Sequence, residues 1–307
     1  MINDYKEGRT ITDNLLVSYV EEAKNINGGA FLKLKFQDVS GTIQGKKWKV
    51  EADDNKILSI GKIVEITGEI VSYHGVLEIK VERVKEVQGN IHLADYQKSA
   101  PLSKEFMLNY IYEKINTFKN DKLKLLVTTI LEDHKNEFSL FPAAVSVHHE
   151  YISGLLHHTY SMLKLGYALK ELYPILDIDL LASGIICHDI GKTYELSDGL
   201  LTTYTTEGSL LGHISIMASL IEKYADKLNI EGEEILLLRH MILAHHGKQE
   251  YGSPVTPATL EAEVLYLIDY TDSKINIYSK VLSEINEGEF TNRIAFLDSQ
   301  RIYKPKK

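Results

Sequence analysis

Histidine and aspartate residues in the second half of the chain have the types and spacing of metal ligands. Nine of the 12 histidines lie between His148 and His246. The apolar run Ile185–Cys187 leads directly into one of them, His188, which is followed by Asp189. A neutral imidazole beside a carboxylate in apolar surroundings costs free energy unless both are paired or bind a cation. The doublet is therefore a candidate metal site.

Further candidate ligands lie before and after the doublet, about one in each predicted helix. They are His157 or His158, then His213, the pair His245–His246, and Asp269. Helical bundles build metal centres from side chains on facing helices. Histidine and aspartate together suit divalent transition metals such as Mn, Fe, Co or Zn.

The order and the flanking residues of these ligands resemble the HD-domain metallophosphohydrolase superfamily. The segments that carry the resemblance are Gly154–Thr159, His188–Lys192, Glu207–His213 and His245–Gly247, the last followed by Gly252–Pro254. With the front domain described below, nearly the whole chain resembles the YhaM family of 3′–5′ exoribonucleases.

The resemblance implies roles for the matching residues. Asp189 could bridge two ions. One of His245 and His246 could bind a metal ion while the other contacts the substrate. Lys192 could neutralise a phosphate oxygen, or it could be a lysine at the end of a helix. We also expect His157 and His240 to be structural, Asp272 to lie behind the ligands, and His149 to contact nucleic acid. The implied metal ligands are His158, His188, Asp189, His213, His245, His246 and Asp269, and the catalytic candidates are Asp189, Lys192 and His245.

This set contains more ligands than one catalytic ion needs when a coordination position stays open. We therefore expect two divalent ions, with manganese as the first choice and iron, cobalt or zinc as alternatives. Such ions activate water for attack on phosphorus and stabilise the attacking and leaving oxygens. The sequence contains no glycine-rich phosphate loop that would indicate a different chemistry.

The front of the chain predicts strands. Between Leu32 and Phe36 apolar residues alternate with lysines, which is typical of a half-buried strand. Ile63–Val71 and Val76–Val84 are two further runs. Five short strands in roughly 75 residues indicate a small barrel, and the OB-fold is a common barrel that binds oligonucleotides.

Lysines and aromatic residues cluster in this predicted barrel. The segment Phe31–Val50 holds five lysines and one acid, Asp38, in a chain of net charge −9. Aromatic side chains between the lysines could stack on bases. The alternative is a solvated strand face with Trp48 in the core. The predicted nucleic-acid-binding residues are Phe31, Lys33, Lys35, Lys46, Lys47, Trp48, Lys49 and Tyr73, together with His149.

Changes of periodicity divide the chain into an OB-type barrel (1–88), a linker (89–102) and an all-α HD domain (103–307). Within the helical part we expect Asp121 to be an N-cap, Thr256 to be another N-cap before Pro257, and Gly191 to end a helix in the left-handed conformation. The basic tail Tyr303–Lys307 is expected to be loose.

The composition, 44% hydrophobic and 25% charged, is that of a globular protein. No apolar run approaches the roughly 20 residues of a membrane span, so no membrane partner is predicted. The single cysteine, Cys187, excludes an internal disulfide and is expected to be a buried apolar residue. We expect a cytoplasmic protein, and a homo-oligomer is compatible with the sequence.

The resulting hypothesis is a metal-dependent 3′–5′ exoribonuclease that acts on single-stranded RNA, with single-stranded DNA as an alternative substrate. A second hypothesis is an HD-domain phosphohydrolase of a nucleotide or signalling molecule, with a regulatory barrel. Against its cyclic-dinucleotide branch, His245–Gly247 is not followed by Gly-Tyr-Pro. The number of ligands argues against a binding module without activity. The sequence does not decide the metal, the choice of RNA or DNA, or the number of subunits.

Overall fold

The structure is a computed structural model that describes the chain except residues 26–27, 74, 88–94, 144–150, 198–201 and 307. It consists of two compact units. Met1–Ser99 forms the first, and Ala100–Ser197 together with Thr203–Lys307 forms the second. The boundary falls within the predicted linker, 89–102, of which residues 89–94 lie outside the described part.

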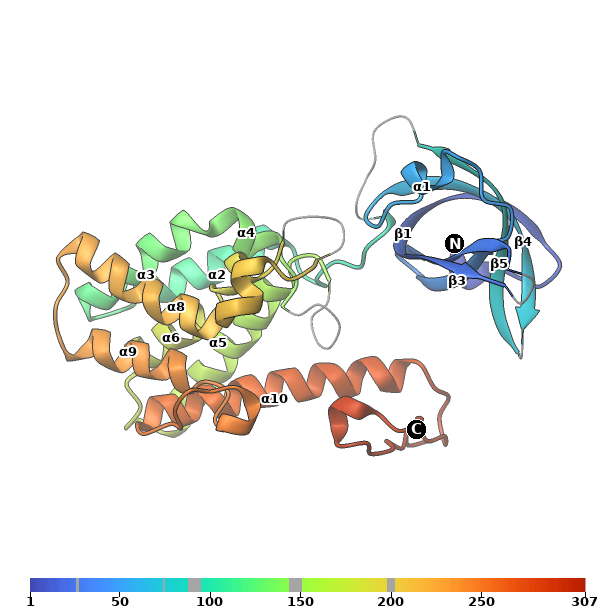
Figure 1. Cartoon of the computed structure of the whole chain (residues 1–307). Coiled ribbons are helices and arrows are strands. Elements are labelled where there is room, and N and C mark those ends of the chain that lie inside the picture. Colours follow the sequence, from blue (N-terminus) through green and yellow to red (C-terminus); the bar gives the residue numbers. More distant parts are fainter. Residues whose placement is uncertain (26–27, 74, 88–94, 144–150, 198–201, 307) are drawn as a thin grey trace. The chain divides into compact units, whose positions relative to one another are not determined.

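The first unit is a closed five-stranded barrel, as the sequence predicts (Figure 1). The strands follow one another around it in the order β1-β2-β3-β5-β4. Neighbouring strands are antiparallel except for β3 and β5, which are parallel. The strands are β1 (Thr10–Lys24), β2 (Ala30–Asp38), β3 (Gly41–Lys47), β4 (Ile63–Tyr73) and β5 (Val76–Glu86), with the short helix α1 (Asp54–Ile57) between β3 and β4.

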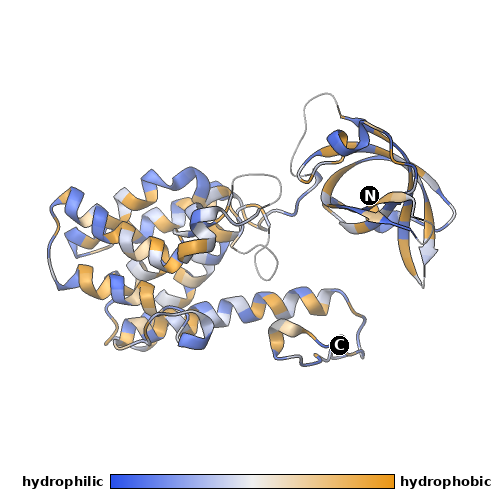
Figure 2. Ribbon diagram, in the orientation of Figure 1, coloured by the Kyte–Doolittle hydropathy of each residue, from blue (hydrophilic) through white to orange (hydrophobic). Residues whose placement is uncertain are grey.

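The alternation in β2 produces the two faces of the barrel wall. Leu32, Leu34 and Phe36 are buried in the barrel core, while Lys33 and Lys35 between them are exposed. Hydrophobic and hydrophilic residues follow one another along the strands in Figure 2. The period of two in the sequence therefore decides which side chains can reach a ligand outside the barrel.

The turn between β2 and β3 is fixed by one carboxylate. Asp38 Oδ1 accepts hydrogen bonds from the backbone amides of Ser40 and Gly41 at 2.7 and 3.0 Å, and Asp38 Oδ2 accepts one from the amide of Ile2 at 2.7 Å. An aspartate that bonds the amides two and three residues ahead is a common way to make a tight turn. The same side chain ties the N-terminal segment to the barrel.

The second unit is helical. Its core is built from the apolar faces of the long helices, for example Leu155, Ile185 and Leu238. Among the residues that the structure describes, no helix is both long and apolar enough to cross a bilayer. The helices are α2 (Lys104–Asn116), α3 (Asp121–Asp133), α4 (Lys135–Leu140), α5 (Gly154–Leu172), α6 (Ile178–Cys187), α7 (Lys192–Glu195), α8 (Thr206–Leu228), α9 (Glu233–Ala244) and α10 (Leu260–Ser283).

Two predicted caps are wrong by a few residues. Asn120, not Asp121, caps α3, and its side-chain oxygen accepts hydrogen bonds from Lys122 N and Leu123 N. Thr259, not Thr256, caps α10 and accepts a hydrogen bond from the amide of Ala262. In both cases another polar residue that can serve as N-cap stands nearby, and the packing of the helix selects between the two.

The C-terminal segment is held in place after α10. Antiparallel bridges join Phe290 to Tyr303 and Ile294 to Gln300, and the Lys304 ammonium donates to the carbonyl of Ile285 at 2.7 Å. The expectation of a loose tail is therefore wrong for Tyr303 and Lys304. This hairpin-like segment has an apolar anchor of its own, because the side chain of Leu297 is buried.

Candidate metal centre

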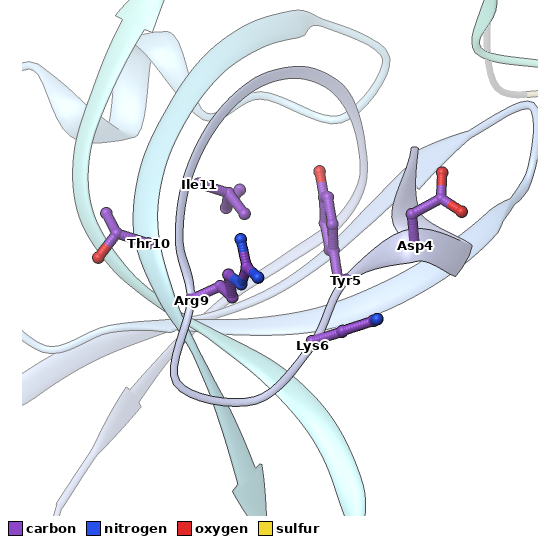
Figure 3. Close-up of a pocket in the computed structure, with 6 residues that line it drawn as sticks. All are labelled: Asp4, Tyr5, Lys6, Arg9, Thr10 and Ile11. Carbon is purple, nitrogen blue, oxygen red and sulfur yellow. The ribbon is translucent and has the colours of Figure 1, made fainter.

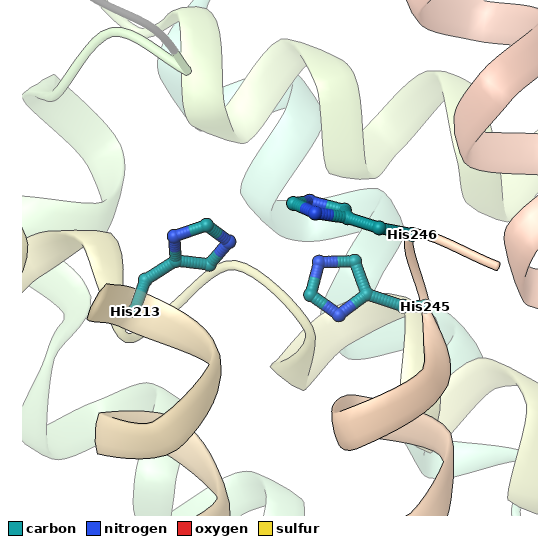
Figure 4. Close-up of side chains that lie close together, drawn as sticks. All are labelled: His213, His245 and His246. Carbon is teal, nitrogen blue, oxygen red and sulfur yellow. The ribbon is translucent and has the colours of Figure 1, made fainter. Parts of the chain in front are cut away.

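The predicted ligands come from five parts of the helical unit and meet at one place. His158 lies on α5, and His188 with Asp189 follows the end of α6. His213 lies on α8, His245 and His246 follow α9, and Asp269 lies on α10. Figure 4 shows the rings of His213, His245 and His246 facing a common space. The residues that the structure brings together are His158, His188, Asp189, His213, His245, His246 and Asp269.

Asp189 is the centre of this arrangement. Its Oδ2 lies 3.2 Å from His188 Nε2 and 4.0 Å from His158 Nε2. Its Oδ1 lies 3.5 Å from His213 Nε2 and 3.9 Å from His245 Nε2. The two oxygens of one carboxylate therefore face two different pairs of imidazoles. This is the geometry of a carboxylate that can bridge two cations.

Each imidazole is held from behind through Nδ1. Where the acceptor is a backbone carbonyl, Nδ1 must carry the proton, so Nε2 keeps its lone pair for a metal. The partners are Asp272 for His158 (2.7 Å), the Ile185 carbonyl for His188 (2.8 Å), Glu195 for His213 (3.0 Å), the Ile242 carbonyl for His245 (2.7 Å) and the Tyr251 carbonyl for His246 (2.9 Å).

The atoms that point inward are of the kind that bind a divalent metal. Among the described residues, four buried atoms of the centre have no hydrogen-bond partner: Asp189 Oδ1 and the Nε2 atoms of His188, His213 and His245. Buried polar atoms without partners are costly, and a metal ion satisfies such atoms. The ligand atoms form two sets, each within 4.8 Å: His158, His188 and Asp189 in one, and His213, His245 and His246 in the other.

The pKa shifts of the side chains in the centre also favour binding of a cation. Burial raises the pKa of Asp189, but His188 and Lys192 outweigh it and hold this pKa well below its usual range. Burial lowers the pKa of His245 and of His246. Burial also lowers the pKa of His158, but its hydrogen bonds to Asp269 and Asp272 raise it overall, to about 10. The carboxylates therefore attract positive charge into the centre, which a proton or a divalent cation can supply.

Lys192 is buried and lies behind Asp189. Its ammonium donates to Asp189 Oδ2 and to the carbonyl of Ala143, both at 2.7 Å. It begins α7, so it does not end a helix as one sequence interpretation held. These contacts give Lys192 a role in orienting Asp189, and its predicted contact with a phosphate oxygen stays a prediction.

Two glycines allow His213 to approach the doublet. Gly191 has φ −55° and ψ −21°, so the prediction that it ends a helix in the left-handed conformation is wrong. A Cβ at Gly191 would lie 2.3 Å from the carbonyl oxygen of His213, so glycine is needed there for a close approach. Gly212 does have a positive φ, +69°, and bends α8 immediately before His213.

Sequence reasoning missed residues that support the centre. Glu195 accepts from the ring of His213 and also from its backbone amide, at 3.2 Å. Ser253 accepts from the amide of His246 at 3.0 Å. Glu195 could have been noticed, since it stands in the segment directly after His188–Lys192. Ser253 could also have been noticed, because it stands in Gly252–Pro254, one of the segments that carry the family resemblance. Of the residues predicted to be structural, His157 contacts the hydroxyl of Tyr151, and His240 Nε2 accepts from the amide of Ala258.

On the barrel, most predicted nucleic-acid residues lie on the outer surface. Lys33 and Lys46 are opposite each other on β2 and β3, and Lys80, which the sequence reasoning missed, lies opposite Lys46 on β5. Lys46 lies 5.0 Å from the ring centre of Tyr73 and forms an ion pair with Glu78. Lys33 is paired with Glu21 at 3.3 Å. Part of the positive charge on this surface is thus already matched.

The aromatic pair next to this surface is half exposed. Phe31 is buried, and its ring stacks on Trp48 with 4.6 Å between the ring centres. Trp48 is 47% exposed and so is not a core residue. Lys35 and Lys49 are exposed. His149 lies outside the described residues. We define the nucleic-acid surface as Lys33, Lys35, Lys46, Trp48, Lys49 and Tyr73.

Lys47 does not belong to this surface, which corrects the prediction for this residue. It is 2% exposed, and its ammonium lies 3.3 Å from the buried carboxylate of Asp54 and 3.2 Å from the carbonyl of Glu82. The alternation in β3 explains this position, because Ile43 also faces inward and lies an even number of residues away. A contact with phosphate would require this internal pair to break.

A hollow of about 390 Å³ lies between the N-terminal segment and the start of β1 (Figure 3). Tyr5 lines it, and its hydroxyl donates to Asp13 at 3.0 Å. Asp4, Lys6 and Arg9 also line it. Their charges are of both signs and indicate no single class of ligand, so we assign this hollow no role.

Comparison with family models identifies both domains. A model of the HD domain matches residues 155–274, and a model of the OB-fold nucleic acid binding domain matches residues 17–87. The chain joins an OB-fold to an HD domain. HD domains are metal-dependent phosphohydrolases, and the HD match covers the segments that contain all the clustered ligands. The two domains support a metal-dependent hydrolase of nucleic acid in general.

Two solved structures are similar to parts of the chain. The second OB-fold domain of replication protein A from Methanococcus maripaludis has 24% identity and a TM-score of 0.25, over 30% of this chain and 97% of that chain. A putative aspartyl-tRNA synthetase from Leishmania major Friedlin has 13% identity and a TM-score of 0.22, over 53% of this chain and 38% of that chain. Neither score supports a conclusion beyond the two domain matches.

Proposed function

We propose that this protein is a metal-dependent 3′–5′ exoribonuclease that hydrolyses single-stranded RNA. The observation that carries the proposal is the position of Asp189 between two sets of ligands, in a chain that also contains an OB-fold nucleic acid binding domain. The RNA substrate and the direction of hydrolysis rest on the resemblance to the YhaM family. Manganese is the first choice of metal on the same ground.

The residues of the centre have different roles. His158, His188 and Asp269 would hold one divalent ion, and His213, His245 and His246 the other, with Asp189 shared between them. Two such ions, when bound, make water a nucleophile at neutral pH and stabilise the charge on phosphate oxygens. Lys192 and the partners behind the imidazoles keep the ligands in place and in the required protonation state.

The nucleic-acid surface would bind the strand that is being shortened. Exposed lysines on the outside of the barrel contact phosphates, and Trp48 offers a ring face to a base. Because the chain carries a net charge of −9, this binding depends on the local surface and not on the overall charge.

The test uses a single-stranded RNA labelled at its 5′ end, a copy with a blocked 3′ end, a paired duplex and a DNA copy, each with Mn²⁺. We expect a ladder that shortens from the 3′ side for the first RNA and little cleavage of the blocked copy and the duplex. Internal cuts in the blocked copy would indicate an endonuclease. The variant Asp189→Asn, which keeps the shape of the side chain, should lose at least nine-tenths of the activity.

The alternative function is hydrolysis of a nucleotide or other small phosphorylated molecule, with the barrel as a regulatory domain. The observation that favours it is the size of the cavity at the centre, about 300 Å³, which suits one small molecule. Rapid hydrolysis of a free nucleotide without cleavage of any RNA would support this alternative and contradict the proposed function.

A further inference from the structure

A cavity of about 300 Å³ adjoins the metal centre and has a second, aromatic side. The ligands Asp189, His246 and Asp269 form one part of its lining. Tyr251, Tyr266 and Tyr270 form another part. A ligand in this cavity would therefore be within reach of both the metal ligands and the tyrosine side chains.

The tyrosines are fixed in relation to the metal ligands. The ring of Tyr266 lies against Gly247, where a Cβ would be only 2.6 Å from the ring. Tyr251 accepts the hydrogen bond from His246 Nδ1 through its carbonyl. Tyr266 and Tyr270, one turn apart on α10, have ring centres 6.0 Å apart and planes at 51° to each other. The same backbone that orients His246 thus also positions the aromatic side of the cavity.

A carboxylate from the C-terminal segment completes the lining. Asp298 follows the short 3-10 helix Ala295–Leu297 and has the left-handed conformation, with φ 52° and ψ 36°. The buried side chain of Leu297 and the bridge between Ile294 and Gln300 fix this position. Asp298 makes no hydrogen bond or ion pair with other residues that the structure describes. An acceptor is therefore presented to the cavity by the segment that follows the ligand helix α10.

We propose that this cavity binds the terminal nucleoside of the strand, with the tyrosines against its base and Asp298 accepting hydrogen bonds from its ribose hydroxyls. This proposal rests on the proposed function and names the part of the substrate that the site recognises. The volume lies at the lower end of the range for small-molecule sites, which suits one nucleoside. Aromatic rings stack on any base, so this contact does not select a sequence.

In this cavity, which Lys192 and Lys274 also line, the Asp298 carboxylate favours a ribose over a phosphate as its own neighbour. Asp298 would repel a phosphate, whereas the hydroxyls of a ribose are donors that a carboxylate accepts well. The 2′ hydroxyl is the group by which a protein distinguishes RNA from DNA at a given site. Asp298 is therefore the residue that would give this enzyme its preference for RNA.

The first experiment measures binding of AMP and 2′-dAMP to the full-length protein by calorimetry, in EDTA and with Mn²⁺. Tyr270→Ala should weaken AMP binding about tenfold, as expected for loss of one stacking ring. Tyr270→Phe should stay within about twofold of wild type, because the ring remains. Tyr278→Ala is the matched control, since Tyr278 is an exposed tyrosine on the same helix outside the cavity. Equal affinities for Tyr270→Ala and wild type would overturn the proposal.

The second experiment concerns Asp298→Asn. Asparagine tolerates the left-handed conformation, so this change removes the charge without forcing the backbone to move. We expect two ratios to fall towards one: the affinity for AMP divided by that for 2′-dAMP, and the cleavage rate of RNA divided by that of DNA. An unchanged preference would contradict the role of Asp298.

Cleavage assays separate the two possible sources of the nucleoside. If the cavity holds the end of a strand, Tyr270→Ala should raise the KM for a 5′-labelled RNA as well as weaken AMP binding. An effect on AMP alone would mean that the cavity binds free mononucleotides, which would overturn the proposal. Hydrolysis of bis(p-nitrophenyl) phosphate by wild type, a substrate without base or ribose, tests the metal centre separately. Hydrolysis of this compound without cleavage of RNA would refute the proposed function, whereas AMP binding would still test the cavity.

Discussion

Replacing Gly191 by alanine tests how the centre is assembled. The backbone of Gly191 is in the ordinary helical region, so alanine causes no conformational strain there. The obstacle is the backbone of His213, whose carbonyl oxygen, carbonyl carbon and Cα would lie 2.3, 3.1 and 3.2 Å from the new Cβ. Because this neighbour is a backbone atom, it cannot move aside by changing a rotamer. The substitution therefore acts on the distance between the doublet and His213.

The size of the effect follows from this distance. Ordinary contact begins at 3.4 Å, so the two segments must separate by about 1.1 Å. Overpacking of this kind costs roughly 1–3 kcal/mol in stability, which corresponds to a fall in Tm of about 3–10 °C for a helical unit of this size. Metal–ligand distances tolerate only about ±0.2 Å. Mn²⁺ binding should weaken on the order of 10- to 100-fold, as when a ligand's support is removed.

The assay is Mn²⁺ titration followed by calorimetry, together with thermal unfolding of the same samples. Gly166→Ala is the matched control, because its Cβ would meet the end of the Ile185 side chain at 2.9 Å, and a side chain can adjust. We expect the control to lose some stability and to bind Mn²⁺ almost as wild type does. A folded Gly191→Ala protein with wild-type Mn²⁺ affinity would refute the reasoning.

Three further predictions concern other parts of the chain. Lys47→Ala leaves the buried Asp54 carboxylate unpaired and should destabilise the barrel by about 3–5 kcal/mol; an unchanged unfolding profile in scanning calorimetry of the full chain would contradict this. Replacing the exposed Lys35 and Lys49 together by alanine should reduce the slope of log K against log salt for single-stranded RNA by about 1.4, at about 0.7 per phosphate contact, and an unaltered slope would exclude these contacts. Burial raises the pKa of Cys187 to about 12, so at pH 8 the folded protein should not react with a disulfide reagent, whereas one thiol per chain should react after unfolding; fast reaction of the folded protein would show that α6 opens.

Local residue patterns are enough to predict the barrel and the helical domain. The alternation around Leu34 predicts a strand with one face inside a barrel, and the structure confirms it. The apolar spacing before His188 predicts a buried helix with His188 and Asp189 in its last turn. The helix is buried, but α6 ends at Cys187 and the two ligands follow it. The strand and the buried helix are predicted correctly because the period of a strand or a helix is a local property, so the residues that must be apolar stand at fixed short intervals.

The predicted ligands share one centre, but the sequence revealed only part of how they are held there. Asp272, which the sequence analysis expected behind the ligands, supports His158 from a position 114 residues away in sequence, whereas Glu195, which supports His213, was missed. The two sides of Asp189 are likewise distinguished only by which helices pack around it. The order of motifs indicates which residues ligate, whereas the direction of each ring depends on hydrogen bonds between distant segments.

Burial and close approach were decided only by the tertiary structure. Lys47 looks like its exposed neighbours in composition, but Asp54 and the closed barrel make it an internal residue. Gly191 resembles a glycine that ends a helix, but glycine is needed there because the backbone of His213 leaves no room for a Cβ. Asp298 reaches the cavity from the end of the chain. In each case the outcome depends on a residue that is distant in sequence and is brought close by packing. Whether a charged group is solvated, or whether a Cβ has room, depends on such atoms, and a local sequence pattern does not include them.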